Sequence, residues 1–108
     1  MTEPPAAIVD FDYLESFTAG DMQVVSEVLQ LFQGQAEIWR GKLADPGDGW
    51  RDLAHTMKGA SRGIGANRLA DAADRAEQGD PSMAGEIRAL LDETVAEIEG
   101  YLTRIGGG

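Results

Sequence analysis

The stretch that decides the fold is Arg51-Asp52-Leu53-Ala54-His55-Thr56-Met57-Lys58-Gly59-Ala60-Ser61-Arg62-Gly63-Ile64-Gly65-Ala66, which contains the single histidine of the 108-residue chain. At about 100° per residue an α-helix has one apolar stripe here, made of Leu53, Met57, Ala60 and Ile64. The opposite face carries His55 together with the cations Arg51, Lys58 and Arg62. The spacing therefore predicts an amphipathic helix that holds its histidine toward water.

Gly59 stands one turn after His55, on the side predicted to be exposed. A glycine inside a helix costs about 1 kcal/mol relative to alanine, so its presence asks for a reason outside helix formation. A side chain here would stand beside the imidazole and obstruct the approach of a partner. Neutral imidazole is a nucleophile near pH 7, and nearby cations offset the charge of an attached phosphoryl group. The arrangement suits a side chain that carries a phosphoryl group.

Charge and composition exclude several other functions. The formal net charge is −10, which argues against binding to nucleic acid. Between Arg51 and Arg68 four cations face one anion, Asp52, and this local balance of +3 predicts an anionic ligand or partner face. The absence of cysteine excludes a disulfide framework and a thiolate metal site. No run approaches the roughly 18 apolar residues of a membrane span, and no signal segment is recognisable, so a cytoplasmic protein is expected.

The remaining sequence predicts further helices joined by short turns. Residues 1–9 are expected to be a disordered lead-in, 10–105 a single helical bundle and 106–108 a flexible tail. A short helix over 10–18 would be capped by Asp10 or Asp12 and would pack as a lid. The apolar side chains of that lid would be Phe11, Leu14 and Phe17.

A long helix is predicted over 21–43, with Asp21 as its N-cap. Its main stripe would be Val24, Val28, Leu31, Phe32, Gln35, Trp39 and Leu43, widened by Val25, Leu29 and Ala36. The histidine helix would be capped by Asp48 and end at Gly63 or Gly65. Together with the two helices described next, this predicts an all-α fold: an antiparallel up-down-up-down four-helix bundle with the short N-terminal helix across one end.

The last two helices are predicted over 67–78 and from 81 to 105. In the first, a stripe of small residues would pack inside: Leu69, Ala72, Ala73 and Ala76. Its opposite face would be merely solvated: Asp71, Asp74, Arg75 and Glu77. The final helix would have Asp80 as its N-cap and Pro81 at its first position.

The run His55-x-x-Lys58-Gly59-x-Ser61-x-x-x-Gly65-Ala66-x-x-Leu69 resembles the signature of histidine-containing phosphotransfer (HPt) domains. The resemblance implies that His55 accepts a phosphoryl group from the phosphoaspartate of one receiver domain and passes it to the aspartate of another. It also implies that Lys58 stabilises the phosphoryl charge and that Gly59 leaves room for the receiver. Weaker candidates for receiver docking are Arg51, Arg62 and Ser61, although Ser61 falls toward the core on the helical wheel.

The same resemblance implies the partners and cofactors. The partners would be response-regulator receiver domains and a hybrid sensor histidine kinase, with no nucleic acid and no membrane. The chain itself would bind no metal or cofactor, while Mg²⁺ would sit on the receiver partner. A monomer is expected, and a homodimer through the broad apolar face of residues 22–43 is the alternative.

Three other functions compete with this interpretation. In the phosphoacceptor domain of a sensor kinase an acidic residue normally follows the histidine, but here Thr56 does. A metal or acid–base site is disfavoured because a zinc site needs three or four protein ligands and the chain has one histidine. A bare scaffold, or a degenerate relay domain that only binds, is disfavoured by the intact set His55, Lys58 and Gly59.

Overall fold

The computed structural model describes residues 8–45, 47–78 and 81–106. Within these ranges the secondary structure is entirely helical. The α-helices are α1 (Phe11–Phe17), α2 (Met22–Ala44), α3 (Trp50–Ile64), α4 (Asn67–Glu77) and α5 (Ala84–Ile105). Two single 3₁₀ turns, Gly47–Gly49 and Pro81–Met83, precede α3 and α5. None of these helices is long and apolar enough to cross a membrane within the described part of the chain.

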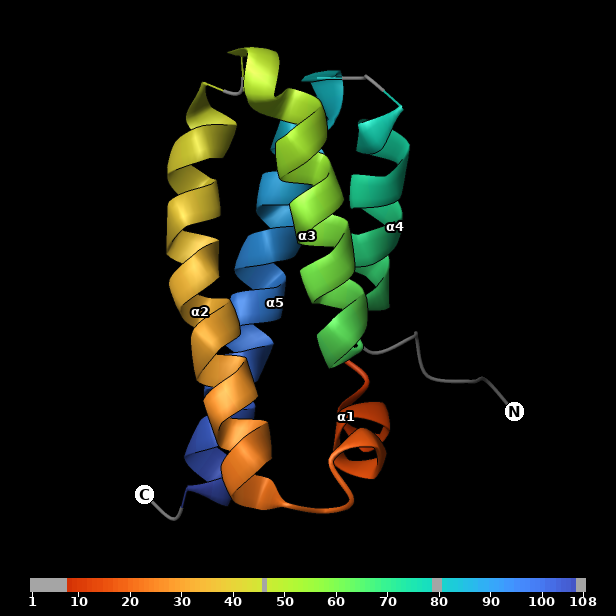
Figure 1. The fold of residues 1–108 in the computed structure, drawn as a ribbon. Helices are drawn as coiled ribbons and strands as arrows, with labels where there is room; N and C mark the ends of the chain where they lie inside the picture. Colours follow the sequence, from red (N-terminus) through yellow and green to blue (C-terminus); the bar gives the residue numbers. More distant parts are fainter. Residues whose placement is uncertain (1–7, 46, 79–80, 107–108) are drawn as a thin grey trace, which may run out of the picture.

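The four longer helices form an antiparallel bundle, as predicted. Each of α2, α3, α4 and α5 packs against its neighbour in the chain, and α5 returns to pack against α2, which closes the bundle. Figure 1 shows α1 at the end where α3 finishes and α2 begins. The closest pairing joins α3 to α4, because the inner side of α4 consists mainly of alanines that let the two backbones approach. The histidine helix is therefore held against α4 along its length.

The buried stripe of α2 differs from the predicted one. The core side chains are Val25, Leu29, Phe32, Ala36, Trp39 and Leu43. Val24, Leu31 and Gln35, which the predicted stripe placed inside, are exposed instead. The Phe32 and Trp39 rings, both on α2, meet edge to face at 5.4 Å on this buried side. The apolar surface of α2 is thus wider than the part of it that the bundle covers.

The N-terminal segment is tied to the end of α3. Val9 is buried in the core, so the packed part of the domain begins before residue 10, while residues 1–7 of the expected lead-in lie outside the described ranges. Asp10 N donates a hydrogen bond to Gly65 O at 2.9 Å, and Asp10 also caps α1 through Tyr13 N. Gly65 has φ +82° and a Cβ there would lie 2.7 Å from Asp10 O, so only glycine fits. Gly65, not Gly63, therefore ends α3.

Helix α1 packs through part of the predicted set only. Leu14 is buried, and the Phe11 ring stacks on Tyr101 of α5 with centroids 4.0 Å apart. Tyr101 Oη donates a hydrogen bond to Glu15 Oε2 at 2.8 Å, which joins α1 to the end of α5. Phe17, predicted to face the core, is 76% exposed. Only one side of α1 therefore packs against the bundle, because this helix has only two turns.

Helix starts also depart from the predictions in two places. Asp21 caps α2 as expected, accepting from Gln23 N and Val24 N. The N-cap of α3 is Gly49, without a side-chain cap, because Asp48 lies inside the preceding 3₁₀ turn. Pro81 begins a 3₁₀ turn rather than α5 itself, and Asp80 lies outside the described residues.

Candidate functional site

Helix α3 presents His55 to solvent. Of the predicted apolar stripe, Leu53, Met57 and Ile64 are buried, and Ala60 is half-buried against the same core. The side chain of His55 on the opposite face is 69% exposed. The orientation follows from the helical period, since the buried residues fix the rotation of α3 and leave the histidine no route to the core.

A carboxylate from the neighbouring helix contacts the imidazole. His55 Nδ1 lies 2.6 Å from Glu77 Oε1 at the end of α4. The hydrogen bonds from Lys58 and His55 lower the pKa of Glu77, so its carboxyl group is ionised at neutral pH and can only accept. Nδ1 is therefore the protonated ring nitrogen. The lone pair of the neutral ring is then on Nε2, the nitrogen that Glu77 does not occupy.

Lys58 is held by the same helix. Its Nζ donates to Glu77 Oε2 at 2.5 Å and to Asp74 Oδ1 at 3.3 Å. The hydrogen bond to Glu77 is the largest of the effects that raise the pKa of Lys58, so the ammonium keeps its charge. Glu77 thus bridges His55 and Lys58, one carboxylate oxygen to each. The predicted pair of phosphoacceptor and cation lies at one place on the surface, joined by a residue from α4.

The predicted positive surface is largely neutralised. Arg62 pairs with Asp71 of α4 at 3.5 Å, and Lys58 pairs with Asp74 and Glu77. These contacts form a ladder of ion pairs, from α3 cations to α4 carboxylates. Arg51 makes no ion pair within the described ranges. The local net charge of +3 counted over residues 51–68 is therefore offset in the folded protein, because the acidic side chains of α4 lie next to these cations.

Gly59 is exposed, and a Cβ added to it would meet no atom within 4 Å. Among the described residues, therefore, none requires a glycine at this position, which agrees with a requirement set by a partner. Ser61 is completely buried, so the prediction that it docks a receiver is wrong: its side chain cannot touch a partner. The Ser61 carbonyl accepts from Ala66 N at 2.8 Å and helps to close α3.

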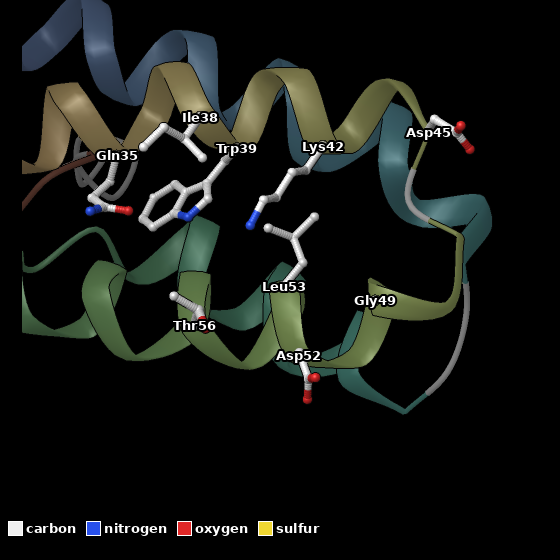
Figure 2. Close-up of a pocket in the computed structure, with 9 residues that line it drawn as sticks. All are labelled: Gln35, Ile38, Trp39, Lys42, Asp45, Gly49, Asp52, Leu53 and Thr56. Carbon is white, nitrogen blue, oxygen red and sulfur yellow. The ribbon is translucent and has the colours of Figure 1, made fainter.

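A furrow lies between α2 and α3 (Figure 2). It has a volume of about 460 Å³, and Figure 2 shows Trp39, Lys42 and Leu53 pointing into it from the two helices. Thr56, the neighbour of His55, lies on its α3 wall and Ile38 on its α2 wall. Ile38 is 52% exposed, and Leu31, two turns earlier on α2, is 72% exposed. Two large apolar side chains of α2 thus stand in water, Ile38 at the furrow and Leu31 two turns before it.

Sequence reasoning missed Glu77 and Asp74, which were assigned to a solvated face. The available signal was complementarity between two helices: Asp71, Asp74 and Glu77 recur every three residues on the segment that follows the cationic helix. An acidic stripe opposite a basic stripe on an adjacent antiparallel helix predicts pairing between the two. Leu31 and Ile38 could be recognised as apolar but not as exposed. Within the described ranges no three His, Cys, Asp or Glu side chains come together as metal ligands would.

Comparison with known proteins gives the family. The family model described as the Hpt domain matches residues 12–101. Among solved structures, the crystal structure of the histidine phosphotransferase ShpA from Caulobacter crescentus superposes with a TM-score of 0.82. Its sequence is 46% identical, over 93% of this chain and 95% of that one. No match was found among the curated proteins. This chain belongs to the HPt family, as the match over residues 12–101 and the exposed histidine on a helical bundle together show. It is therefore a phosphocarrier of phosphorelays and not a kinase.

Proposed function

We propose that His55 Nε2 accepts a phosphoryl group from the phosphoaspartate of one receiver domain and passes it to the aspartate of another. The observation that carries this proposal is the 2.6 Å contact between Nδ1 and Glu77 on an exposed ring. It leaves the lone pair of the neutral imidazole on the other nitrogen. His55 is the only histidine of a chain that belongs to a family of histidine phosphocarriers.

Lys58 is the cation that would stabilise the phosphoryl group on His55. It lies three residues further along α3, on the same exposed side, and its ammonium already touches the carboxylate that holds the ring. A phosphoryl group on Nε2 would add a second anion near Nζ and draw the ammonium from Asp74, the longer of its two contacts at 3.3 Å. Lys58 would thus move by rotamer change alone, without movement of the helix.

The docking surface for the receiver is the face around the furrow between α2 and α3. Thr56, Gly59 and Gly63 share one side of α3, and Leu31 and Ile38 share the facing side of α2. Exposed apolar side chains next to a bare stretch of backbone fit a protein partner that must come close to the ring. Arg51 and Arg62, at either end of the exposed face of α3, would contact the rim of the partner.

The partners that fit this site are response-regulator receiver domains and, upstream, a hybrid sensor histidine kinase. The receiver would bring Mg²⁺ and its own carboxylates, and this chain would supply the nucleophile and a cation. We further propose that the protein acts in the cytoplasm as a monomer, since the apolar face of α2 that could join two copies is the face offered to the receiver.

The experiment that tests the assignment uses a phosphorylated receiver domain and the full chain. Wild-type protein should gain acid-labile label, whereas His55→Gln should gain none and keep its helical circular dichroism. Label on the His55→Gln protein would exclude His55 as the acceptor. For the docking surface, Ile38→Glu should slow transfer, while Ala96→Glu should not, since Ala96 lies with Ile8 and Arg68 on another side of the bundle. Equal rates for the two variants would refute the docking face.

A further inference from the structure

We propose that the charge of Glu77 stabilises the imidazolium that forms when His55 is phosphorylated, and thereby keeps the phosphoryl group easily transferable. This inference rests on the proposed role of His55 as the acceptor. Glu77 would be a positioning residue, because it touches the ring nitrogen opposite the reacting one and never the phosphorus. Its two oxygens serve different groups: Oε1 accepts from His55 Nδ1 at 2.6 Å, and Oε2 from Lys58 Nζ at 2.5 Å.

The charge appears because no proton leaves during the transfer. The Nε2 lone pair forms the bond to phosphorus as the bond from phosphorus to the receiver's carboxylate oxygen breaks, and that carboxylate leaves with the electron pair. The ring began neutral with its proton on Nδ1, so after the step it carries one positive charge shared by both nitrogens. A carboxylate in contact with Nδ1 stabilises that charge more than a neutral hydrogen-bond acceptor would.

The same charge favours the next transfer. A phosphorylated ring that keeps its Nδ1 proton leaves as neutral imidazole, whereas a ring that has lost it must leave as an anion. Glu77 therefore favours the transferable form up to higher pH. An opposite charge in contact shifts a titration by about one to three pH units. The arrival of the phosphoryl group strengthens this effect, because Lys58 then has a second anion to neutralise and shields Glu77 less.

The other charged groups around the ring do not replace Glu77. On α3 itself these are Arg51, Asp52, Lys58 and Arg62. From α4, apart from Glu77, Asp74 is bonded to Lys58 and not to the ring. From α2 the group on this side is Lys42, in the furrow with Asp52. Within the described residues, Glu77 is the acidic side chain hydrogen-bonded to His55. A single substitution of Glu77 therefore removes the negative charge next to Nδ1.

The test compares Glu77→Gln with wild type in the full-length protein. Glutamine keeps an oxygen that can accept from Nδ1 but removes the charge, so it separates tautomer choice from charge stabilisation. Each protein is labelled from a phosphorylated receiver, purified from it, and followed for spontaneous loss of label across pH. The expected result is a hydrolysis profile whose midpoint lies about one pH unit or more lower in Glu77→Gln, with about tenfold slower loss on its alkaline side.

Asp71→Asn is the matched control, since it also converts an α4 carboxylate to an amide but removes a contact with Arg62 rather than with His55. It should leave the profile unchanged. An identical midpoint for Glu77→Gln and wild type, with both labelled at His55, would overturn the inference and leave the proposed function intact. Failure of wild type to take up label would instead remove the proposed function, so the two failures are distinguishable. Glu77→Ala, which also loses the acceptor, should be labelled more slowly than Glu77→Gln; an equal or faster rate would contradict a positioning role.

Discussion

Replacing Gly59 by leucine should make the protein more stable and at the same time inactive in transfer. The stability gain follows from the open space around this residue, where a Cβ meets no atom within 4 Å. Leucine is among the better helix formers, so the change contributes up to about 1 kcal/mol. For a domain of this size that corresponds to a rise in melting temperature of about 4 °C.

The loss of activity has a different origin. Gly59 lies one turn from His55 on the exposed side of α3, where neighbouring side chains stand about 5–6 Å apart. A leucine there occupies the space through which the receiver's phosphoaspartate must approach Nε2. A misplacement of about 1 Å costs about 100-fold in rate, and a leucine side chain displaces the partner by more. We expect phosphotransfer to fall by at least that factor.

Two measurements on each variant separate these effects: thermal unfolding by circular dichroism, and the rate of label transfer from a phosphorylated receiver. Gly100→Leu is the control, because Gly100 is equally open and helical but lies on α5 and not on the α2–α3 face. It should gain similar stability and keep wild-type transfer. Wild-type transfer by Gly59→Leu would refute the reasoning that this glycine exists for the partner, and a lower melting temperature would refute the reading of its surroundings.

Three further changes test other parts of the structure. Lys58→Ala should slow transfer by about tenfold or more through loss of a charge-assisted contact. It should change the melting temperature little, because ion pairs at a protein surface add little stability. Identical rapid-quench kinetics would remove Lys58 from the mechanism. Gly65→Ala should lower the free energy of unfolding by more than about 1 kcal/mol, since a left-handed backbone and a contact of 2.7 Å with Asp10 O both oppose a Cβ. Denaturant unfolding compares it with Gly63→Ala, which has open space around its Cβ and should stabilise the protein. Equal effects of the two substitutions would contradict this prediction. Burial, with help from the hydrogen bond to Glu15, raises the pKa of Tyr101 to about 12, above the reference value of 10.0. The contribution of Tyr101 to stability is therefore complete below pH 10 and is lost as pH rises toward 12. Tyrosinate absorbance in a Tyr13→Phe background should report that late titration, and Tyr101→Phe should abolish the associated loss of stability. A Tyr101 midpoint near 10 would show that the ring is not packed between α1 and α5.

Hydrophobic periodicity predicted the helices and the orientation of α3, because a single amphipathic stripe leaves one way to bury Leu53, Met57 and Ile64. It misplaced the stripe of α2, where apolar residues cover more than the core-facing side. Periodicity registers that Leu31 is apolar but not whether another helix covers it. Leu31, one of the misplaced residues, lies on the face that we assign to the receiver.

The candidate site was predictable as far as it lies within one helix. His55, Lys58 and Gly59 are related by spacing along α3, which the sequence states directly. Glu77 is 22 residues away from His55 and reaches it only because α4 folds back along α3. No spacing rule within a helix addresses that contact. Ser61 shows the converse case: it belongs to the sequence pattern, but full burial restricts it to packing.

The ladder of ion pairs between α3 and α4 has a consequence for how a partner arrives. Paired charges act as small dipoles, whose field decays faster with distance than that of an isolated cation, and mobile ions screen it within about 8 Å at physiological ionic strength. The formal charge of −10 of the whole chain acts over a longer distance than these pairs do, so at low ionic strength it repels an acidic partner. Added salt should therefore speed the encounter with an acidic receiver. Long-range attraction is weak, so complexes form through contact alone and separate quickly, which suits a carrier that must leave one partner to reach the next.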